Sequence, residues 1–181
     1  ISEIDPNPLV SGKGVAALRA EGIVVENGLF LERALQQNDI FRHWVRQRKP
    51  WVALKMSVSL DGKISPAQKK RHEVFYLIGE AAQDRVHWMR QEYDSILVGV
   101  NTVLQDNPRL TTRLANHHPL HHPMPIVLDG RGRTPTTARL LWPVLGRKNP
   151  LIVVGPRAPK KNCLALEKKG ANVLVVPEKK G

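Results

Sequence analysis

The chain has 181 residues, and its 28 Lys and Arg against 16 Asp and Glu give a formal net charge of +12. With 41% hydrophobic residues it has enough apolar material for a core, which excludes wholesale disorder. No apolar run approaches the about 18 residues that a membrane span needs, and the N-terminal ISEIDPNP lacks the composition of a secretory signal. The only cysteine is Cys163, which fits a reducing compartment, so we expect a cytoplasmic protein.

The first 48 residues predict a helix, a strand and a second helix. VAALRAEG at 15–22 has helix-forming composition and ends at a glycine, and IVVEN at 23–27 alternates like a short strand. Apolar residues at roughly helical spacing predict the second helix over 29–48. Because a core of this size is marginal, we expect this segment to pack on something else.

The best boundary candidate is Arg48-Lys49-Pro50, where composition, charge balance and structural period all change. Residues 1–48 carry six acids and six bases, so the whole charge excess lies in residues 49–181. Such asymmetry is typical of proteins that bind nucleic acid, an anionic membrane or a phosphorylated small ligand. The sequence therefore predicts two parts, residues 1–48 and residues 49–181.

The second part alternates strands with helices. WVALKMSVS at 51–59 alternates with period two and ends at the turn Leu60-Asp61-Gly62, and SILVGV at 95–100 has the near-continuous apolar character of a strand buried on both faces. Further buried strands are predicted at 126–129, 151–155 and 173–177, with helices over 79–91, from Thr102, and over 160–170. This pattern predicts an α/β fold with a largely parallel sheet.

Lys55 lies in the middle of the predicted strand 51–59, on one face with Ser57. An ammonium there is costly unless it meets an acid, a carbonyl or a ligand. A lysine that extends to solvent or forms an ion pair is an equally good interpretation. Asp61-Gly62 follows the same strand, but this pair is also ordinary turn chemistry.

The segment VGVNTVLQDNPRLTTR at 98–113 is the richest in polar function. Arg109 or Arg113 could bind a phosphate with a forked guanidinium, whereas Asn101 or Thr102 could simply cap a helix. Arg90 could likewise only complement a helix dipole. The tract HHPLHHP at 117–123 could bind a metal, but without a nearby carboxylate or thiolate a surface loop is the favoured interpretation.

A basic nucleic-acid-binding module is the main alternative from another class. The lysines near the C-terminus come in pairs, but the last aromatic residue of the chain is Trp142. The stacking side chains on which single-strand binders rely are therefore missing where the charge is densest. No glycine-rich phosphate-binding motif is present either.

Four stretches, WVALKMSVSLDGKI, IGEAAQDRVHWMR, DSILVGVNTVLQDNPRLTTR and PIVLDGRGRTP, together resemble the reductase domain of the bifunctional riboflavin-biosynthesis pyrimidine deaminase/reductase. DPNPLVSGKGVAALRAEGIVV resembles the closing segment of the deaminase domain that precedes it. The resemblance implies a dihydrofolate-reductase-like α/β domain over 49–181, C-terminally incomplete, after a helix-strand-helix deaminase tail. It also implies a homo-oligomer that binds no nucleic acid.

The implied activity is the NADPH-dependent reduction of 5-amino-6-(5-phospho-D-ribosylamino)uracil to its ribitylamino product. Lys55 matches a lysine near the reacting ribose carbon, where an ammonium can polarise the group that accepts hydride. The remaining matches are assigned by position: Ser57, Tyr76, Thr102 and Asp106 to the cofactor, and Val74, Arg90, Leu110 and Arg113 to the phosphorylated pyrimidine substrate.

Three departures from the family pattern accompany this resemblance. Val74 and Tyr76 stand where the family has serine and tryptophan, which leaves open a reductase of the same fold with another pterin- or pyrimidine-like substrate. The deaminase signature, His-x-Glu with Pro-Cys-x-x-Cys, is missing, so zinc is expected only in a deaminase domain that this chain lacks. The family's Glu-Gly-Gly stretch is also missing before Gly181.

Overall fold

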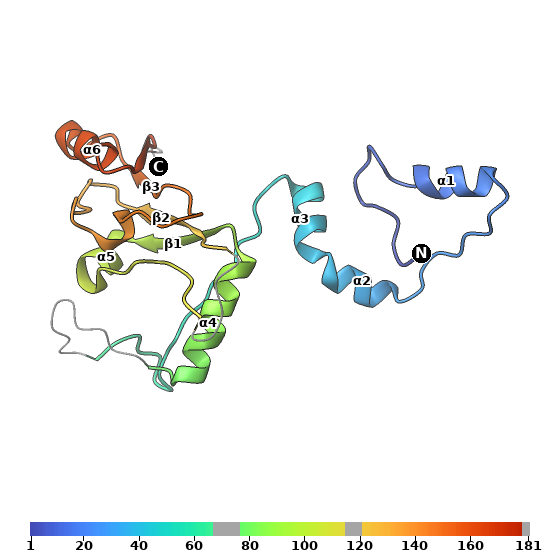
Figure 1. Ribbon diagram of the computed structural model, residues 1–181, viewed down its shortest axis with the longest axis horizontal. Coiled ribbons are helices and arrows are strands. Elements are labelled where there is room, and N and C mark those ends of the chain that lie inside the picture. Colours follow the sequence, from blue (N-terminus) through green and yellow to red (C-terminus); the bar gives the residue numbers. More distant parts are fainter. Residues whose placement is uncertain (67–76, 115–120, 179–181) are drawn as a thin grey trace. The chain divides into compact units, whose positions relative to one another are not determined.

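The structure is a computed structural model that describes residues 1–66, 77–114 and 121–178. The chain divides into two compact units, Ile1–Lys55 and Met56–Gly181, and Figure 1 labels most of their elements. The predicted domain boundary after Arg48 lies inside the first unit, and the domain assignment stays a prediction. No helix among the described residues is long and apolar enough to cross a membrane.

The first unit contains three helices, α1 Lys13–Ala20, α2 Leu31–Gln37 and α3 Asp39–Gln47. The predicted strand over 23–27 was wrong, because no neighbouring strand in this described part of the chain supplies the ladder that a strand needs. Val24 is instead 89% exposed, and the Glu26 carbonyl accepts a hydrogen bond from the N-terminal ammonium. The single helix predicted over 29–48 is interrupted at Asn38, where φ is −103° and ψ is 15°.

The second unit is built on a parallel sheet with the strand order β1-β2-β3-β4. Its strands are β1 Ser95–Gly99, β2 Met124–Leu128, β3 Leu151–Val154 and β4 Asn172–Val175. Its helices are α4 Glu80–Glu92, α5 Val100–Asp106 and α6 Lys160–Glu167 (Figure 1). A 3-10 turn, η1, spans Arg139–Leu141. The predicted α/β class is confirmed, and these strands and helices lie within a few residues of their predicted positions.

The core lies on one face of this sheet. Val127 and Ile152 are fully buried there, and Val103 of α5 and Leu166 of α6 belong to the same apolar cluster. The other face is only partly covered, since Leu97, Leu128 and Leu174 are 57%, 47% and 49% exposed. The prediction that β1 is buried on both faces was therefore wrong, because the helices that supply the core pack against one face alone.

The predicted strand over 51–59 does not form, and no described strand pairs with these residues. Its alternating apolar side chains, from Val52 to Val58, are all at least half exposed. An alternating pattern supplies one apolar face but not the partner strand that satisfies the backbone. The turn that follows was predicted correctly, because the Gly62 amide donates to the Ser59 carbonyl at 2.9 Å and the φ of Gly62 is +76°.

The loops that follow β2 and β3 contact each other directly. The Gly155 amide donates to the Gly130 carbonyl at 3.0 Å, and the Asp129 amide donates to the Val153 carbonyl at 2.8 Å. A Cβ atom at position 155 would lie only 2.8 Å from the Gly130 carbonyl oxygen. Position 155 therefore requires glycine for steric reasons.

Candidate anion-binding site

The centre of the candidate site is the segment 107–113, which follows α5. Asn107 and Leu110 adopt left-handed backbone conformations, with φ of 44° and 56°. Such conformations cost on the order of 1–3 kcal/mol in residues other than glycine and persist only where surrounding contacts enforce them. One such contact is the hydrogen bond that the Arg139 amide donates to the Asn107 Oδ1 atom at 2.8 Å.

Two predicted substrate-binding arginines meet at Thr111 of this segment. Arg90 of α4 donates from Nη1 to the Thr111 carbonyl at 2.8 Å, and Arg113 donates from Nη1 to Thr111 Oγ1 at 3.1 Å. Leu110, the third predicted substrate-binding residue here, is buried beside them. The structure thus brings Arg90, Leu110 and Arg113 to one short segment, whereas their role in binding stays a prediction.

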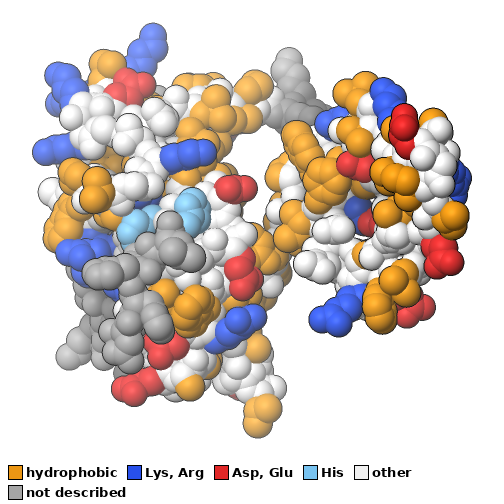
Figure 2. Space-filling view, turned by 45° about the vertical axis from the view of Figure 1, so that its right-hand side comes forward, with side chains coloured by type: hydrophobic (Ala, Val, Ile, Leu, Met, Phe, Trp, Pro, Cys, Tyr) orange, Lys and Arg blue, Asp and Glu red, His pale blue; other side chains and the backbone are white. Residues whose placement is uncertain are grey.

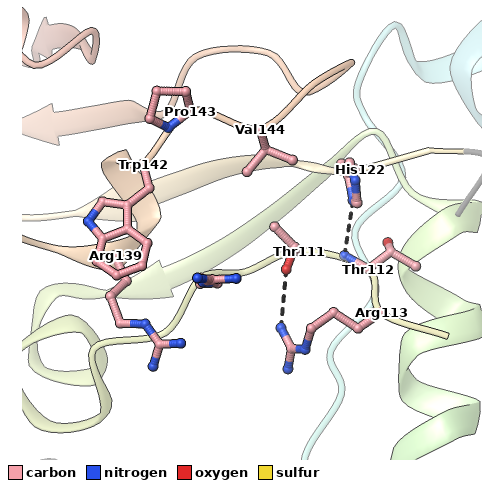
Figure 3. Close-up of a pocket in the computed structure, with 9 residues that line it drawn as sticks. Thr111, Thr112, Arg113, His122, Arg139, Trp142, Pro143 and Val144 are labelled. Carbon is pink, nitrogen blue, oxygen red and sulfur yellow. Dashed lines mark hydrogen bonds between the residues drawn. The ribbon is translucent and has the colours of Figure 1, made fainter. Parts of the chain in front are cut away.

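A pocket of about 270 Å³ opens beside this segment (Figure 3). Its lining includes three arginines and one histidine, and none of the nine described lining residues is acidic: Arg109, Thr111, Thr112, Arg113, His122, Arg139, Trp142, Pro143 and Val144. The guanidinium carbons of Arg109 and Arg139 lie 5.0 and 5.7 Å from the centre of the Trp142 ring. This excess of positive donors suits an anionic ligand.

Arg147 connects the backbone segments that form the pocket wall. Its Nη1 atom donates to the Arg109 carbonyl at 3.1 Å, and its Nη2 atom donates to the carbonyls of Leu140 and Trp142 at 2.7 and 2.8 Å. Burial lowers the pKa of Arg147 below its ordinary value. The guanidinium nevertheless stays charged at neutral pH, so these are charge-assisted bonds.

Two imidazoles lie next to the segment 111–113. His122 accepts a hydrogen bond at Nδ1 from the Thr112 amide at 3.3 Å, which Figure 3 marks, and His87 of α4 accepts one from the Arg113 amide at 3.2 Å. Burial, followed by the charges of Arg90 and Arg113, lowers the pKa of His87 to about 4. Burial, followed by Arg147 and His121, lowers the pKa of His122.

Three of the four predicted cofactor residues lie in other parts of the described chain. Thr102 and Asp106 are both half-buried and one turn apart on α5, so they share a face of that helix. Ser57 is half-buried in the second unit. Lys55, the predicted catalytic residue, is exposed and is the last residue of the first unit.

Some predicted residues lie outside the described part of the chain. Val74 and Tyr76 belong to the segment 67–76, and half of the histidine tract belongs to 115–120. Among the described residues, no group of three His, Cys, Asp or Glu side chains could hold a metal ion. The alternative that Asn101 or Thr102 caps α5 was wrong, because the cap is Gly99 and both residues lie inside the helix. The Asn101 Oδ1 atom accepts a hydrogen bond from Arg133 at 3.0 Å.

Several residues of the site were missed by sequence reasoning. Arg139, Trp142 and Arg147 follow β2 in a stretch without regular strand or helix periodicity, so nothing in the local pattern separates them from ordinary surface residues. His87 lies among helix-forming residues, where a histidine has no distinctive signal. Asp129 was also missed, and it is a buried carboxylate whose Oδ2 atom accepts from the amide and hydroxyl of Thr134, both at 2.7 Å.

Residues 50–179 match the family model described as the RibD C-terminal domain. The chain belongs to this family. It is 34% identical over 176 residues to the riboflavin biosynthesis protein RibD of Aquifex aeolicus, with 97% of this chain and 47% of the relative covered. It is 40% identical over 141 residues to the RibD of Actinobacillus pleuropneumoniae, with 78% of this chain and 36% of the relative covered.

Solved structures of RibD proteins resemble the chain as well. One form of Acinetobacter baumannii RibD matches with a TM-score of 0.76 at 30% identity, covering 98% of this chain and 47% of that one. A diaminohydroxyphosphoribosylaminopyrimidine deaminase/5-amino-6-(5-phosphoribosylamino)uracil reductase from Thermotoga maritima matches with a TM-score of 0.68 at 29% identity, covering 98% and 52%. The chain thus spans about half the length of these RibD structures, and the predicted dihydrofolate-reductase-like α/β fold is confirmed.

Proposed function

We propose that the second part of the chain acts in riboflavin biosynthesis as an NADPH-dependent reductase of 5-amino-6-(5-phospho-D-ribosylamino)uracil. The observation that carries this proposal is the pocket beside Arg113, with three arginines and no acidic residue among its described lining. Membership in the RibD C-terminal domain family supports the same reaction class. On this proposal residues 1–48 are the tail of a deaminase domain, and residues 49–181 belong to the reductase domain.

The pocket would bind the 5′-phosphate of the substrate. Arg113, Arg109 and Arg139 together offer more donors than the three terminal oxygens of a phosphomonoester require. Arg90 would act from the other side of the segment, because its hydrogen bond to the Thr111 carbonyl fixes the backbone that carries Arg113. Leu110, buried at the same bend, would contact the sugar.

The chemistry at the carboxyl ends of the strands fits a phosphorylated dinucleotide. Open parallel sheets bind ligands beyond these ends. Here the loops after β2 and β3 carry three exposed basic side chains, Arg131, Arg133 and Arg157. Thr102 and Asp106 would bind the same ligand from α5, together with Ser57. NADPH, when bound, supplies the hydride that reduces the ribose carbon C1′.

Lys55 would carry the protein's part of the chemistry. After the ribose ring opens, C1′ belongs to an aldehyde or imine, and a neighbouring ammonium would draw electron density away from it. Because the charge would assist the reaction more than cofactor binding, Lys55→Ala is expected to lower the rate of NADPH oxidation while leaving NADPH affinity nearly unchanged. An unchanged rate would remove Lys55 from the mechanism.

The proposal is tested by calorimetric titration of the chain with NADPH and with ribose 5-phosphate. Arg113→Met should weaken ribose 5-phosphate binding by about tenfold or more, as expected for loss of a hydrogen bond from a charged donor. Lys148→Met removes the same charge from an exposed side chain outside the pocket lining, and it should leave the affinity unchanged. Binding of neither NADPH nor ribose 5-phosphate would refute the assignment.

The nucleic-acid alternative is not favoured. On the face shown in Figure 2, the Lys and Arg side chains are scattered among acidic and apolar ones and are not gathered into one basic patch. Sequence-independent nucleic-acid binding would instead depend on a continuous row of cations that follows the phosphates. Steeply salt-dependent binding of generic oligonucleotides, with no competition by ribose 5-phosphate, would reverse this judgement.

A further inference from the structure

Two histidines from separate elements accept hydrogen bonds from consecutive backbone amides. The Thr112 amide donates to His122, and the Arg113 amide donates to His87, in each case at Nδ1. A backbone amide can only donate, so both Nδ1 atoms must carry a free lone pair. Both rings are therefore neutral, with the proton on Nε2.

His87 has a second donor at the same nitrogen. The Arg90 Nη1 atom lies 3.3 Å from His87 Nδ1 and also donates to the Thr111 carbonyl at 2.8 Å. A guanidinium has no acceptor atom, so this contact also requires an unprotonated Nδ1. His87 and Arg90 thus bind neighbouring backbone groups of the segment that carries Arg113.

This segment needs such contacts because its backbone is strained. Leu110, directly before Thr111, has a φ of 56°, and Thr111 and Thr112 are buried. The Thr112 amide is partly buried where it meets His122, and a buried amide without a partner costs about 1–3 kcal/mol, so loss of the His122 acceptor would favour rearrangement of the segment. The bond from the Arg113 amide to His87 is exposed, so its loss would act in the same direction at a smaller cost. Rearrangement would move Arg113 away from the pocket that it lines.

We propose that His87 and His122 are positioning residues: their neutral imidazoles fix the Thr112 and Arg113 backbone so that the arginine pocket can hold a phosphomonoester. This inference rests on the proposed function for the identity of the ligand, but not for the two hydrogen bonds. Protonation of either ring would replace an acceptor with a donor aimed at an amide and would release the segment.

The charged surroundings favour the neutral rings. His87 faces Arg90 and Asp84 on its own helix and Arg113 from the segment 107–113, and a backbone hydrogen bond with Thr111 together with Asp84 only partly opposes the two arginines. His122 interacts electrostatically with Arg147 and with its neighbour His121. Positive neighbours outnumber negative ones at both rings, so both imidazoles stay neutral near pH 7.

The test compares His87→Asn with His87→Leu. An asparagine Oδ1 atom can occupy nearly the place of the imidazole Nδ1 atom and accept the same bond, whereas leucine has similar bulk and no acceptor. We expect the affinity for ribose 5-phosphate to fall about fivefold or more in His87→Leu and to stay within about twofold in His87→Asn. His122→Leu and His122→Asn form a second pair that serves if a His87 variant does not fold.

Two further measurements separate this inference from the proposed function. In the chain without ligand, nuclear magnetic resonance should detect a scalar coupling across the N–H···N bond from the Arg113 amide to the His87 ring. Acidification should weaken ribose 5-phosphate binding more in the original chain than in a His87→Asn/His122→Asn double variant, since the asparagines do not titrate.

Equal affinities of the leucine and asparagine variants, or an Arg113 amide signal unchanged in His87→Leu, would overturn the positioning role. If the original chain does not bind ribose 5-phosphate at all, the proposed function fails. In that case the coupling and the amide signal alone decide whether the imidazoles hold the segment.

Discussion

Arg147 offers the most direct test of how the pocket wall is held. Replacing it with methionine keeps most of the apolar stem but removes three hydrogen bonds to the carbonyls of Arg109, Leu140 and Trp142. Each of these carbonyls lies in a stretch that contributes to the pocket. The substitution should therefore destabilise the second unit and loosen the pocket at the same time.

The magnitude follows from the exposure of the three bonds. The bond to the Leu140 carbonyl is partly buried and, as a bond from a charged donor, contributes about 1.5–3 kcal/mol. The bonds to the Arg109 and Trp142 carbonyls are exposed, and each contributes between about 0 and 1 kcal/mol. Together the three bonds predict a loss of about 1.5–5 kcal/mol of unfolding free energy, which corresponds to a fall in melting temperature of roughly 10 °C.

Urea denaturation followed by circular dichroism measures this loss, provided that the m-value is unchanged. Lys148→Met is the matched control, because it removes the same charge from the adjacent exposed residue. Hydrogen exchange of peptides from 139–147 should accelerate in Arg147→Met and not in Lys148→Met. Equal stability of the two variants within about 0.5 kcal/mol would show that the three bonds do not hold the wall.

Three further predictions concern buried or strained groups. Thr134→Val removes the hydroxyl bond to the buried Asp129 carboxylate and should lower the unfolding free energy in urea by about 1.5–3 kcal/mol, whereas a change below about 0.5 kcal/mol would contradict this. Asn107→Ala and Asn107→Gly both lose the hydrogen bond from the Arg139 amide, but alanine tolerates a φ of 44° less well than glycine. The unfolding free energy in urea should therefore be lower for Asn107→Ala than for Asn107→Gly, and the reverse order would refute the strain argument. The pKa of His87 is about 4 in the folded chain and 6.5 ordinarily, so between these pH values the unfolded chain binds a proton that the folded chain does not. The unfolding free energy should therefore be highest above about pH 6.5 and fall toward pH 4. His87→Asn should flatten this part of the plot of unfolding free energy against pH.

The sheet could be predicted because its strands are nearly pure apolar runs between turn residues. IVLD and LIVVG form β2 and β3 close to where the runs lie, since a short apolar run between turn residues is typical of a strand in a parallel sheet. The segment 51–59 failed for the opposite reason. Its alternation describes one strand, but a strand exists only when another backbone completes the hydrogen bonds, and a single sequence window does not contain that information.

The candidate site was predicted in part from local polar density and in part from the family resemblance. Arg109 and Arg113 were found through the polar segment 98–113 and Arg90 and Leu110 through the resemblance, but Arg139 and Trp142 come from a stretch after β2 that carries no motif. His87 and His122 depend on which backbone amides the fold brings to their rings. Such contacts between distant segments arise from tertiary packing, so sequence spacing could not reveal them.

The contact between Gly155 and Gly130 limits how this protein can change. Because a side chain at position 155 would collide with the Gly130 carbonyl, the loops after β2 and β3 cannot vary independently. An insertion tolerated in one loop must leave the other in place, or both lose their bond at the carboxyl end of the sheet. Engineering of these loops should therefore exchange the two together, with Gly155 retained.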